Sequence, residues 1–263
     1  MTRGAAITPL RLAGIGKRFG RLAVLRHIDL TVDAGEVVGL VGANGSGKTT
    51  LLSIIAGLLP ASDGQRFLGD AEVPDIDQDH RARMAFVTHT TQLYPRLTAH
   101  ENLALFEDLR RASGLSTRPA EPLLQRLSLT HAADRPVATY SRGMMQRLAL
   151  ARALAGTPEL LLLDEPFTAL DRPGRQQLAD VLLEERARGL AVLLSSHDFE
   201  ALVTVADRVV LLEGGRLVGE AARDGDDRDA FRERVLSLGL GETRAPADGP
   251  GQSDEAREAS AHA

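Results

Sequence analysis

The sequence predicts an α/β fold built on a parallel sheet with helices on both faces. Short, fully apolar runs recur along the 263 residues, and runs without polar alternation are typical of strands buried on both sides. Helical stretches separate these runs, which is the pattern of the α/β class. The predicted buried strands are 37–41, 84–87, 160–163, 191–194 and 209–212.

Two further strands are predicted before this core. Residues 10–14 and 28–32 alternate apolar and polar side chains, which suits antiparallel strands with one exposed face. We therefore expect an N-terminal antiparallel β subdomain beside the parallel sheet.

A helical block, about 98–156, is predicted as a subdomain inserted between two strands of the sheet. Thr98 and Glu101 form a capping box that opens a helix through about Arg111. Pro119 begins a second helix, and Ser141 caps a third that ends at Gly156. Beyond 220 we expect a short helical extension over 221–240. Residues 241–263, with five acidic and two basic residues and little apolar bulk, are predicted to be disordered.

Composition excludes several classes of protein. Without cysteine the chain has no disulfide, no Cys-ligated zinc and no thiol chemistry. A net charge of −5 argues against a nucleic acid partner. No apolar run approaches the ~20 residues of a membrane-spanning helix, and the first ten residues lack the apolar run of a secretory signal. We expect a cytoplasmic protein that reaches a membrane only through a partner.

A phosphate-binding loop follows the first buried strand. The segment matches the P-loop pattern G-x-x-x-x-G-K-[ST] and leads into an apolar helix predicted over 50–58. Its glycines let backbone N–H groups turn toward an anion at a helix N-terminus. The loop consists of Gly42, Ala43, Asn44, Gly45, Ser46, Gly47, Lys48 and Thr49.

Lys48 stands out because only two of the 31 basic residues are lysines. A compact ammonium can reach the β- and γ-phosphates of a nucleotide in a way that the planar guanidinium of arginine does not reproduce. Thr49 offers a hydroxyl to Mg²⁺. The sequence therefore predicts that the chain binds a nucleotide together with Mg²⁺.

Polar residues that suit hydrolysis follow two other predicted strands. Asp164 and Glu165 end the strand at 160–163, where Asp164 would hold Mg²⁺ and Glu165 would polarise the attacking water. Acids also end strands for structural reasons, and the P-loop in the same chain favours the catalytic role. His197 follows the strand at 191–194 and is expected at the same edge of the sheet.

The order of several motifs resembles the ATP-binding subunits of ABC transporters, with a P-loop NTPase (RecA-like) core over about 8–220. Residues 140–147, Tyr-Ser-Arg-Gly-Met-Met-Gln-Arg, are similar to the family's signature, usually Leu-Ser-Gly-Gly-Gln. Residues 168–171 resemble its D-loop, and residues 196–198 contain its switch histidine. The resemblance implies the catalytic residues Lys48, Glu165 and His197, and a nucleotide site that also includes Phe19 against the adenine and Thr50.

The resemblance also implies that two copies pair face to face around two ATP molecules. Ser141, Arg142, Gly143 and Met144 would then contact the γ-phosphate held by the other subunit, with Asp171 nearby. Arg142 replaces the first signature glycine and Met144 the glutamine. The helix N-terminus behind Ser141 presents positive charge outward, which suits a phosphate.

His89 occupies the position where the family places its Q-loop glutamine, while Gln92 comes three residues later. The resemblance thus makes His89 a candidate contact to nucleotide and Mg²⁺. The segment from His89 to Asn102 is where the family's transmembrane subunit docks. Leu93 and Tyr94 are candidates for that groove, and the alternative is that they belong to the subdomain core.

His89, the run Thr-Ala-His-Glu-Asn-Leu at 98–103 and Tyr140–Met144 are most similar to CcmA-type ATPases of the haem exporter in cytochrome c maturation. Other, multidrug-type exporters share the Tyr-Ser-Arg-Gly-Met block and remain an alternative. A soluble ABC ATPase, such as an iron–sulfur assembly scaffold, is a further alternative. A regulator that binds nucleotide without turnover is disfavoured by Glu165 and His197.

Overall fold

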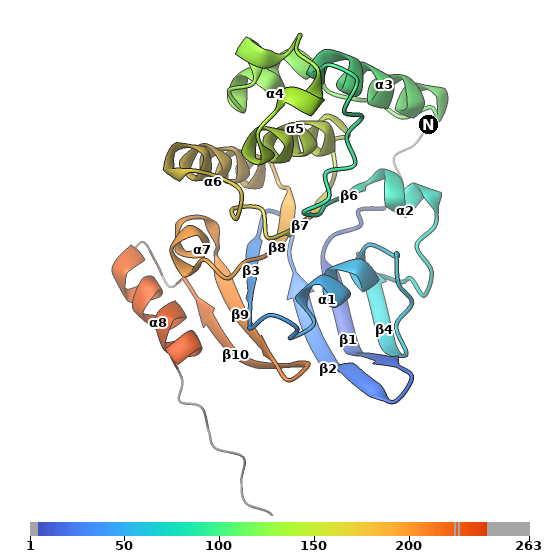
Figure 1. The fold of residues 1–263 in the computed structure, drawn as a ribbon. Coiled ribbons are helices and arrows are strands. Elements are labelled where there is room, and N and C mark those ends of the chain that lie inside the picture. Colours follow the sequence, from blue (N-terminus) through green and yellow to red (C-terminus); the bar gives the residue numbers. More distant parts are fainter. Residues whose placement is uncertain (1–4, 224, 226, 241–263) are drawn as a thin grey trace, which may run out of the picture.

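The larger of two sheets forms the centre of the fold in the computed structural model, which describes residues 5–223, 225 and 227–240 (Figure 1). Its strand order is β10-β9-β3-β8-β7-β6. All neighbours pair in parallel except β9 and β10, which are antiparallel. The strands are β3 (Val37–Val41), β6 (Met84–Val87), β7 (Leu160–Asp164), β8 (Ala191–Ser195), β9 (Arg208–Glu213) and β10 (Arg216–Ala222). The α/β class and the five predicted strands are confirmed, although in β6, at the edge of the sheet, only Val87 is buried.

Apolar side chains on both faces of this sheet explain its uninterrupted apolar runs. Along β7, Leu160 and Leu162 face one core, and Leu161 and Leu163 face the other. Helix α1 (Lys48–Ile55) and the smaller sheet cover the first face. Helices α5 (Arg142–Ala155), α6 (Arg172–Ala187) and α7 (Phe199–Val205) contribute buried residues to the second core.

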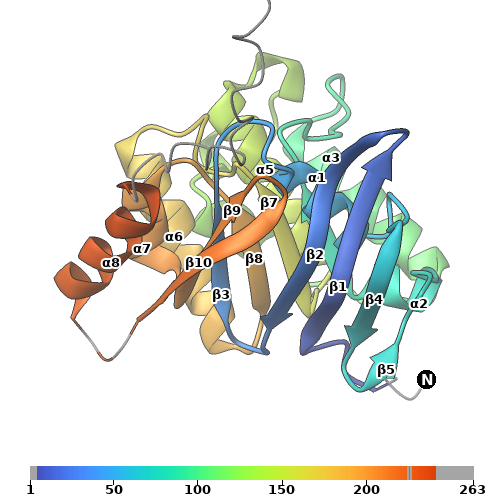
Figure 2. The same ribbon diagram turned by 90° about the horizontal axis from the view of Figure 1, so that it is seen from below.

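The smaller sheet is antiparallel, with strand order β2-β1-β4-β5 (Figure 2). Its strands are β1 (Leu10–Phe19), β2 (Leu22–Val32), β4 (Asp63–Leu68) and β5 (Ala71–Glu72). The first two are the strands predicted at 10–14 and 28–32, extended toward a tight hairpin. Strands β4 and β5 and the short helix α2 (Gln78–Ala82) were not predicted, because few of their residues are buried apolar side chains.

Three helices lie between β6 and β7 in the sequence: α3 (Ala99–Ala112), α4 (Ala120–Arg126) and α5. Both hydrogen bonds of the predicted capping box are present at Thr98. Ion pairs join this block to α6, since Arg118 and Arg126 both bind the buried carboxylate of Glu185. Burial raises the pKa of Glu185, and the two guanidinium groups outweigh this effect, so the pKa lies below its usual range.

The C-terminal part of the described chain differs from the prediction in one respect. Strand β10 continues to Ala222, and helix α8 (Arg228–Leu240) begins only at Arg228, whereas a helical extension was predicted from 221. An exposed edge strand has the weak apolar pattern that sequence analysis misses. The predicted disordered tail, 241–263, lies outside the described residues. Within the described ranges, none of the helices has the length and apolarity needed to cross a bilayer.

Candidate active site

The loop between β3 and α1 contains two glycines at positions that leave no room for a side chain. Gly47 has φ +110°, and a Cβ there would lie 2.8 Å from the Leu25 side chain. At Gly42 a Cβ would lie 2.3 Å from the carbonyl oxygen of Leu212. These close approaches explain why both positions need glycine.

Lys48 is buried at the start of α1. Its ammonium donates to the carbonyl oxygens of Gly42 at 2.8 Å and Ala43 at 3.2 Å. In the same loop, the hydroxyl oxygen of Ser46 is buried without a hydrogen-bond partner in the described structure. A buried cation, an unsatisfied hydroxyl and a helix N-terminus together form a site that suits phosphate.

Asp164 ends β7 with both carboxylate oxygens bonded. Oδ2 accepts from Thr49 Oγ1 at 2.8 Å, and Oδ1 accepts from Ser195 Oγ at 2.6 Å. Mg²⁺ prefers oxygen ligands and is usually held by one or two carboxylates together with substrate phosphates and water. No group of three or more acids or histidines that could hold a metal occurs among the described residues. The hydroxyl of Thr49 and the carboxylate of Asp164, 2.8 Å apart, are oxygen donors of the kind that suits Mg²⁺.

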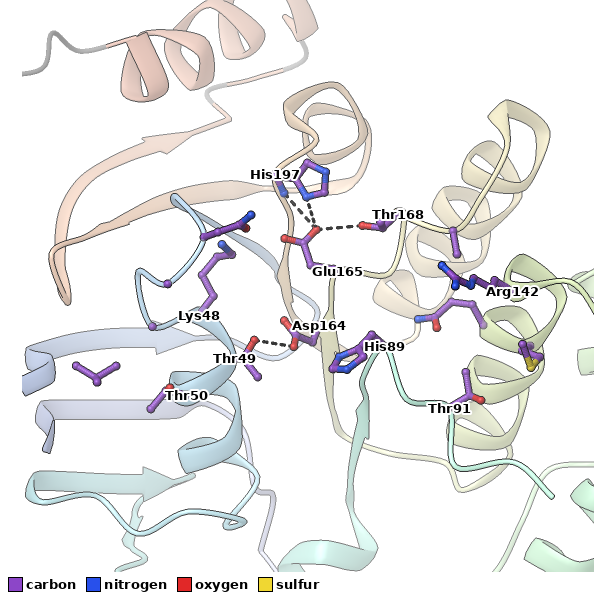
Figure 3. A pocket seen from close by; sticks show the side chains of 17 residues that line it. Lys48, Thr49, Thr50, His89, Thr91, Arg142, Asp164, Glu165, Thr168 and His197 are labelled. Carbon is purple, nitrogen blue, oxygen red and sulfur yellow. Dashed lines mark hydrogen bonds and ion pairs between the residues drawn. The ribbon is translucent and has the colours of Figure 1, made fainter. Parts of the chain in front are cut away.

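Glu165 adopts a left-handed backbone conformation with φ +53°, which costs about 1–2 kcal/mol in a residue with a Cβ. Its N–H is held by Ser195, with the side-chain oxygen at 3.1 Å. His197 Nδ1 lies 2.8 Å from Glu165 Oε2, and Thr168 Oγ1 donates to the same oxygen at 3.4 Å (Figure 3). The strained turn thus aims the carboxylate at the imidazole.

Lys48, Asp164, Glu165 and His197 line one pocket of about 790 Å³, the main pocket. It lies at the carboxyl edge of the large sheet, where α/β folds bind ligands. The predicted site residues that line it are Asn44, Gly45, Gly47, Lys48, Thr49, Thr50, His89, Arg142, Asp164, Glu165 and His197.

The remaining predicted residues lie elsewhere. Gly42, Ala43 and Ser46 line an adjoining side pocket, which also contacts Asn44, Gly45 and His197. Phe19 lines neither pocket: it lies at the end of β1, about half exposed, with the Lys17 ammonium 5.0 Å from its ring centroid. The other predicted residues outside both pockets are Ser141, Gly143, Met144 and Asp171.

The N-terminus of α5 packs against the segment 168–171. Ser141 caps the helix by accepting from the Met144 N–H at 3.2 Å, and its side chain is exposed. A Cβ on Gly143 would lie 2.8 Å from the carbonyl oxygen of Ala169. The glycine at 143 therefore allows the helix to approach this loop closely, while Arg142 points into the main pocket (Figure 3).

His89, and not Gln92, lies at the main pocket. Gln92 has φ +50°, and its carbonyl accepts from Arg152 of α5 at 2.6 Å. Of the two docking candidates, Tyr94 is 55% exposed and Leu93 packs partly into the core. The buried side chain of Asn102 fixes this turn through hydrogen bonds with the backbone N–H and carbonyl of Tyr94.

Sequence analysis gave no role to several residues of this site. Ser195 contacts both acids, and its place follows from the pairing of β7 with β8, which sets Asp164 opposite Ser195. Adjacent parallel strands that both end in polar residues are the signal that could have revealed it. Val24 lines the main pocket without any predicted role. The remaining lining residues belong to segments predicted as motifs but were not predicted individually: Thr91, Met145, Gln146, Thr168 and Ala169.

Comparison with known proteins places this site among nucleotide-binding cassettes. A family model described as "ABC transporter" matches residues 25–168. The Nod factor export ATP-binding protein I of Burkholderia lata is 37% identical over 220 residues, which cover 82% of this chain and 71% of that protein. The sulfate/thiosulfate import ATP-binding protein CysA of Salmonella typhimurium is 40% identical over 240 residues, which cover 87% of this chain and 64% of that protein.

Solved structures give the same result. The ATP-binding subunit of an ABC transporter superposes with a TM-score of 0.75 at 29% identity, covering 87% of this chain and all of that one. A dimeric ATP-binding cassette in a post-hydrolysis state bound to ADP and Pi has a TM-score of 0.72 at 28% identity, covering 82% and 100%. The predicted P-loop NTPase fold is confirmed.

Proposed function

Because the chain belongs to the ABC transporter family, as an ATP-binding and ATP-hydrolysing subunit, we propose that two copies enclose two ATP molecules and drive an integral membrane partner. Each composite site would combine the main pocket of one copy with residues 141–144 of the other. The observation that supports hydrolysis in this site is the contact of Glu165 with His197 beside the Thr49–Asp164 pair, and the exposed cap at Ser141 supports the pairing of two copies.

The proposed chemistry assigns a separate role to each group of the main pocket. Lys48 and the backbone N–H groups of the P-loop bind the phosphates. Glu165 accepts a proton from the attacking water, and His197, at 2.8 Å, orients the carboxylate. Mg²⁺ held by Thr49 and Asp164 would neutralise charge on the phosphates. His89, exposed at the pocket beside Thr91, is proposed as the polar group that replaces the Q-loop glutamine.

Glu165→Gln tests the catalytic assignment. The amide keeps the size of the side chain and cannot accept the proton, so ATP turnover should fall by at least about 100-fold. ATP should still bind, and the variant should accumulate as an ATP-bound dimer in size-exclusion chromatography. A nucleotide-binding regulator without turnover predicts no change in ATP consumption, and wild-type turnover in this variant contradicts the proposal.

The membrane partner is proposed to dock on the segment His89–Asn102, with the exposed Tyr94 in the contact. This would place the subunit on the cytoplasmic face of the membrane. Affinity purification from solubilised membranes should recover an integral membrane protein, and Tyr94→Ala should reduce that recovery. If no integral membrane protein is recovered, the chain is a soluble ABC ATPase, such as an iron–sulfur assembly scaffold.

For the transported molecule we propose an exporter of the haem type in cytochrome c maturation. The support is the sequence at His89, 98–103 and 140–144. A different exporter is the second candidate, favoured by the 37% identity to a Nod factor export protein, and the relatives also include a sulfate importer. Deletion of the gene should abolish covalent haem attachment to c-type cytochromes, and intact cytochromes c would exclude the haem assignment.

A further inference from the structure

We propose that Arg175 is a positioning residue that holds His197 against Glu165 by joining the segment 168–171, here called the partner-facing loop, to Asp198. This inference rests on the proposed function, in which Glu165 and His197 act in hydrolysis. It adds a residue outside the main pocket to the groups that control turnover.

Arg175 contacts two segments at once from the first turns of α6. Its Nε donates to the carbonyl oxygen of Leu170 at 3.2 Å, and its Nη1 donates to Asp198 Oδ2 at 2.5 Å. The planar guanidinium sets these two donors at a fixed separation, which a lysine ammonium does not provide. The distance between the partner-facing loop and Asp198 is therefore set by one rigid side chain.

Asp198 is suited to pass this constraint to the histidine. It is the N-cap of α7, where Oδ1 accepts from the Ala201 N–H at 3.1 Å. Its own N–H donates to Ser196 Oγ at 3.0 Å. Hydrogen bonds thus hold Ser196 and Asp198, the two neighbours of His197 in the chain. The Asp198 carboxylate is also bound by Arg175.

The contacts close into a ring. His197 binds Glu165, Glu165 accepts from Thr168, and Thr168 begins the partner-facing loop whose Leu170 carbonyl binds Arg175. The same loop lies against the start of α5 at Gly143. Displacement of the loop by a second copy would therefore reach Glu165 from two directions, through Thr168 and through Arg175.

This role can be separated from a contribution to folding. The side chain of Arg175 is 44% exposed, and ion pairs at exposed positions contribute little to stability. Loss of Arg175 should thus leave the fold intact while misplacing the imidazole. Small errors in the position of a catalytic group reduce turnover by one to two orders of magnitude.

The test measures kcat and KM for ATP, ATP affinity and Tm on the full-length protein. Arg175→Ala should lower kcat about tenfold and leave KM, ATP affinity and Tm unchanged. Arg175→Lys should not restore kcat, because an ammonium cannot span both acceptors. Adding Asp198→Asn to Arg175→Ala should lower kcat no further, because both changes break one link. Arg172→Ala, on the same turn and equally charged, is the matched control and should keep wild-type turnover.

Three results would overturn the inference: wild-type kcat in Arg175→Ala, full activity in Arg175→Lys, or an equal loss in Arg172→Ala. These outcomes are distinct from failure of the proposed function. If Glu165→Gln keeps its turnover, the proposed function fails. If Glu165→Gln is inactive while Arg175→Ala turns over normally, only the role of Arg175 is wrong.

Discussion

The two regions that the sequence assigns to nucleotide are built in opposite ways. In the main pocket, Lys48 and Asp164 are buried, and the side chains of Lys48, Asp164 and Glu165 each contact another part of the chain. At the start of α5, Ser141 is exposed and bonds only to its own helix. An exposed helix N-terminus outside the pocket still carries partial positive charge. The difference supports the proposal that the first region binds ATP alone and that the second contributes to the site of another copy.

Of all the substitutions, Lys48→Ala should have the largest effect on ATP affinity, because it removes the buried ammonium that lines the main pocket. Loss of charge-assisted hydrogen bonds to phosphate should cost about 2–3 kcal/mol, or roughly a hundredfold in the Kd for ATP. Isothermal titration calorimetry measures the change. Lys48→Arg keeps the charge and should remain impaired, because the guanidinium has a different shape. An affinity near that of the wild type in Lys48→Ala would show that the pocket does not bind ATP through this residue.

Ser141→Ala should separate the two regions. In the isolated subunit, ATP affinity should be unchanged, since Ser141 lies outside the main pocket. Turnover should fall about a hundredfold, the cost of removing one donor to a developing oxyanion, and loss of the cap should cost about 1 kcal/mol of stability.

Asp77→Ala provides the matched control for Ser141→Ala. Asp77 caps α2 by accepting from the His80 N–H, and it lines neither the main pocket nor the side pocket. The Asp77→Ala variant loses a side-chain cap to the N–H three residues later, as Ser141→Ala does, and should keep full turnover. If both variants lose turnover equally, the effect of Ser141→Ala comes from lower stability. The start of α5 would then have no role in hydrolysis beyond its contribution to the fold.

The main pocket was more predictable than the contacts that orient it. The P-loop and the acids at 164–165 can be predicted because both directly follow apolar strands, and this pattern is visible in a short stretch of sequence. The left-handed turn at Glu165 and the hydroxyl of Ser195 depend on which strands are neighbours, and that is a property of the whole sheet. The adenine contact of Phe19 stays a prediction: its ring is about half exposed at the end of β1 and lines neither pocket.

The same reasoning explains the elements that were not predicted. Strand β4 carries the buried Arg66, whose guanidinium donates to the carbonyl oxygens of Ile54, Val73 and Pro74. A buried arginine that satisfies backbone carbonyls has no apolar signature, so the strand resembled a loop. Elements held by polar contacts of this kind cannot be found from apolar periodicity alone.

The smallest expected effect concerns the helical block that positions Ser141. His100 on α3 binds Asp134 through Nδ1 at 2.9 Å and Glu121 of α4 through Nε2 at 3.1 Å. The hydrogen bond to Asp134 and then that to Glu121 raise the pKa of His100 above its usual value. A raised pKa in the folded state means that the stabilisation is complete below the unfolded pKa of about 6.5 and is lost as pH rises through the folded pKa.

His100→Gln should therefore destabilise the protein more at pH 6 than at pH 9, as measured by urea unfolding. The difference should stay below about 1 kcal/mol, because the imidazole is 42% exposed and water screens the pair. Asp134→Asn should remove more of the pH dependence than Glu121→Gln, since the Asp134 hydrogen bond contributes the larger share of the shift. An equal loss at both pH values would mean that His100 stabilises the helical block by packing and not through its hydrogen bonds with the two carboxylates.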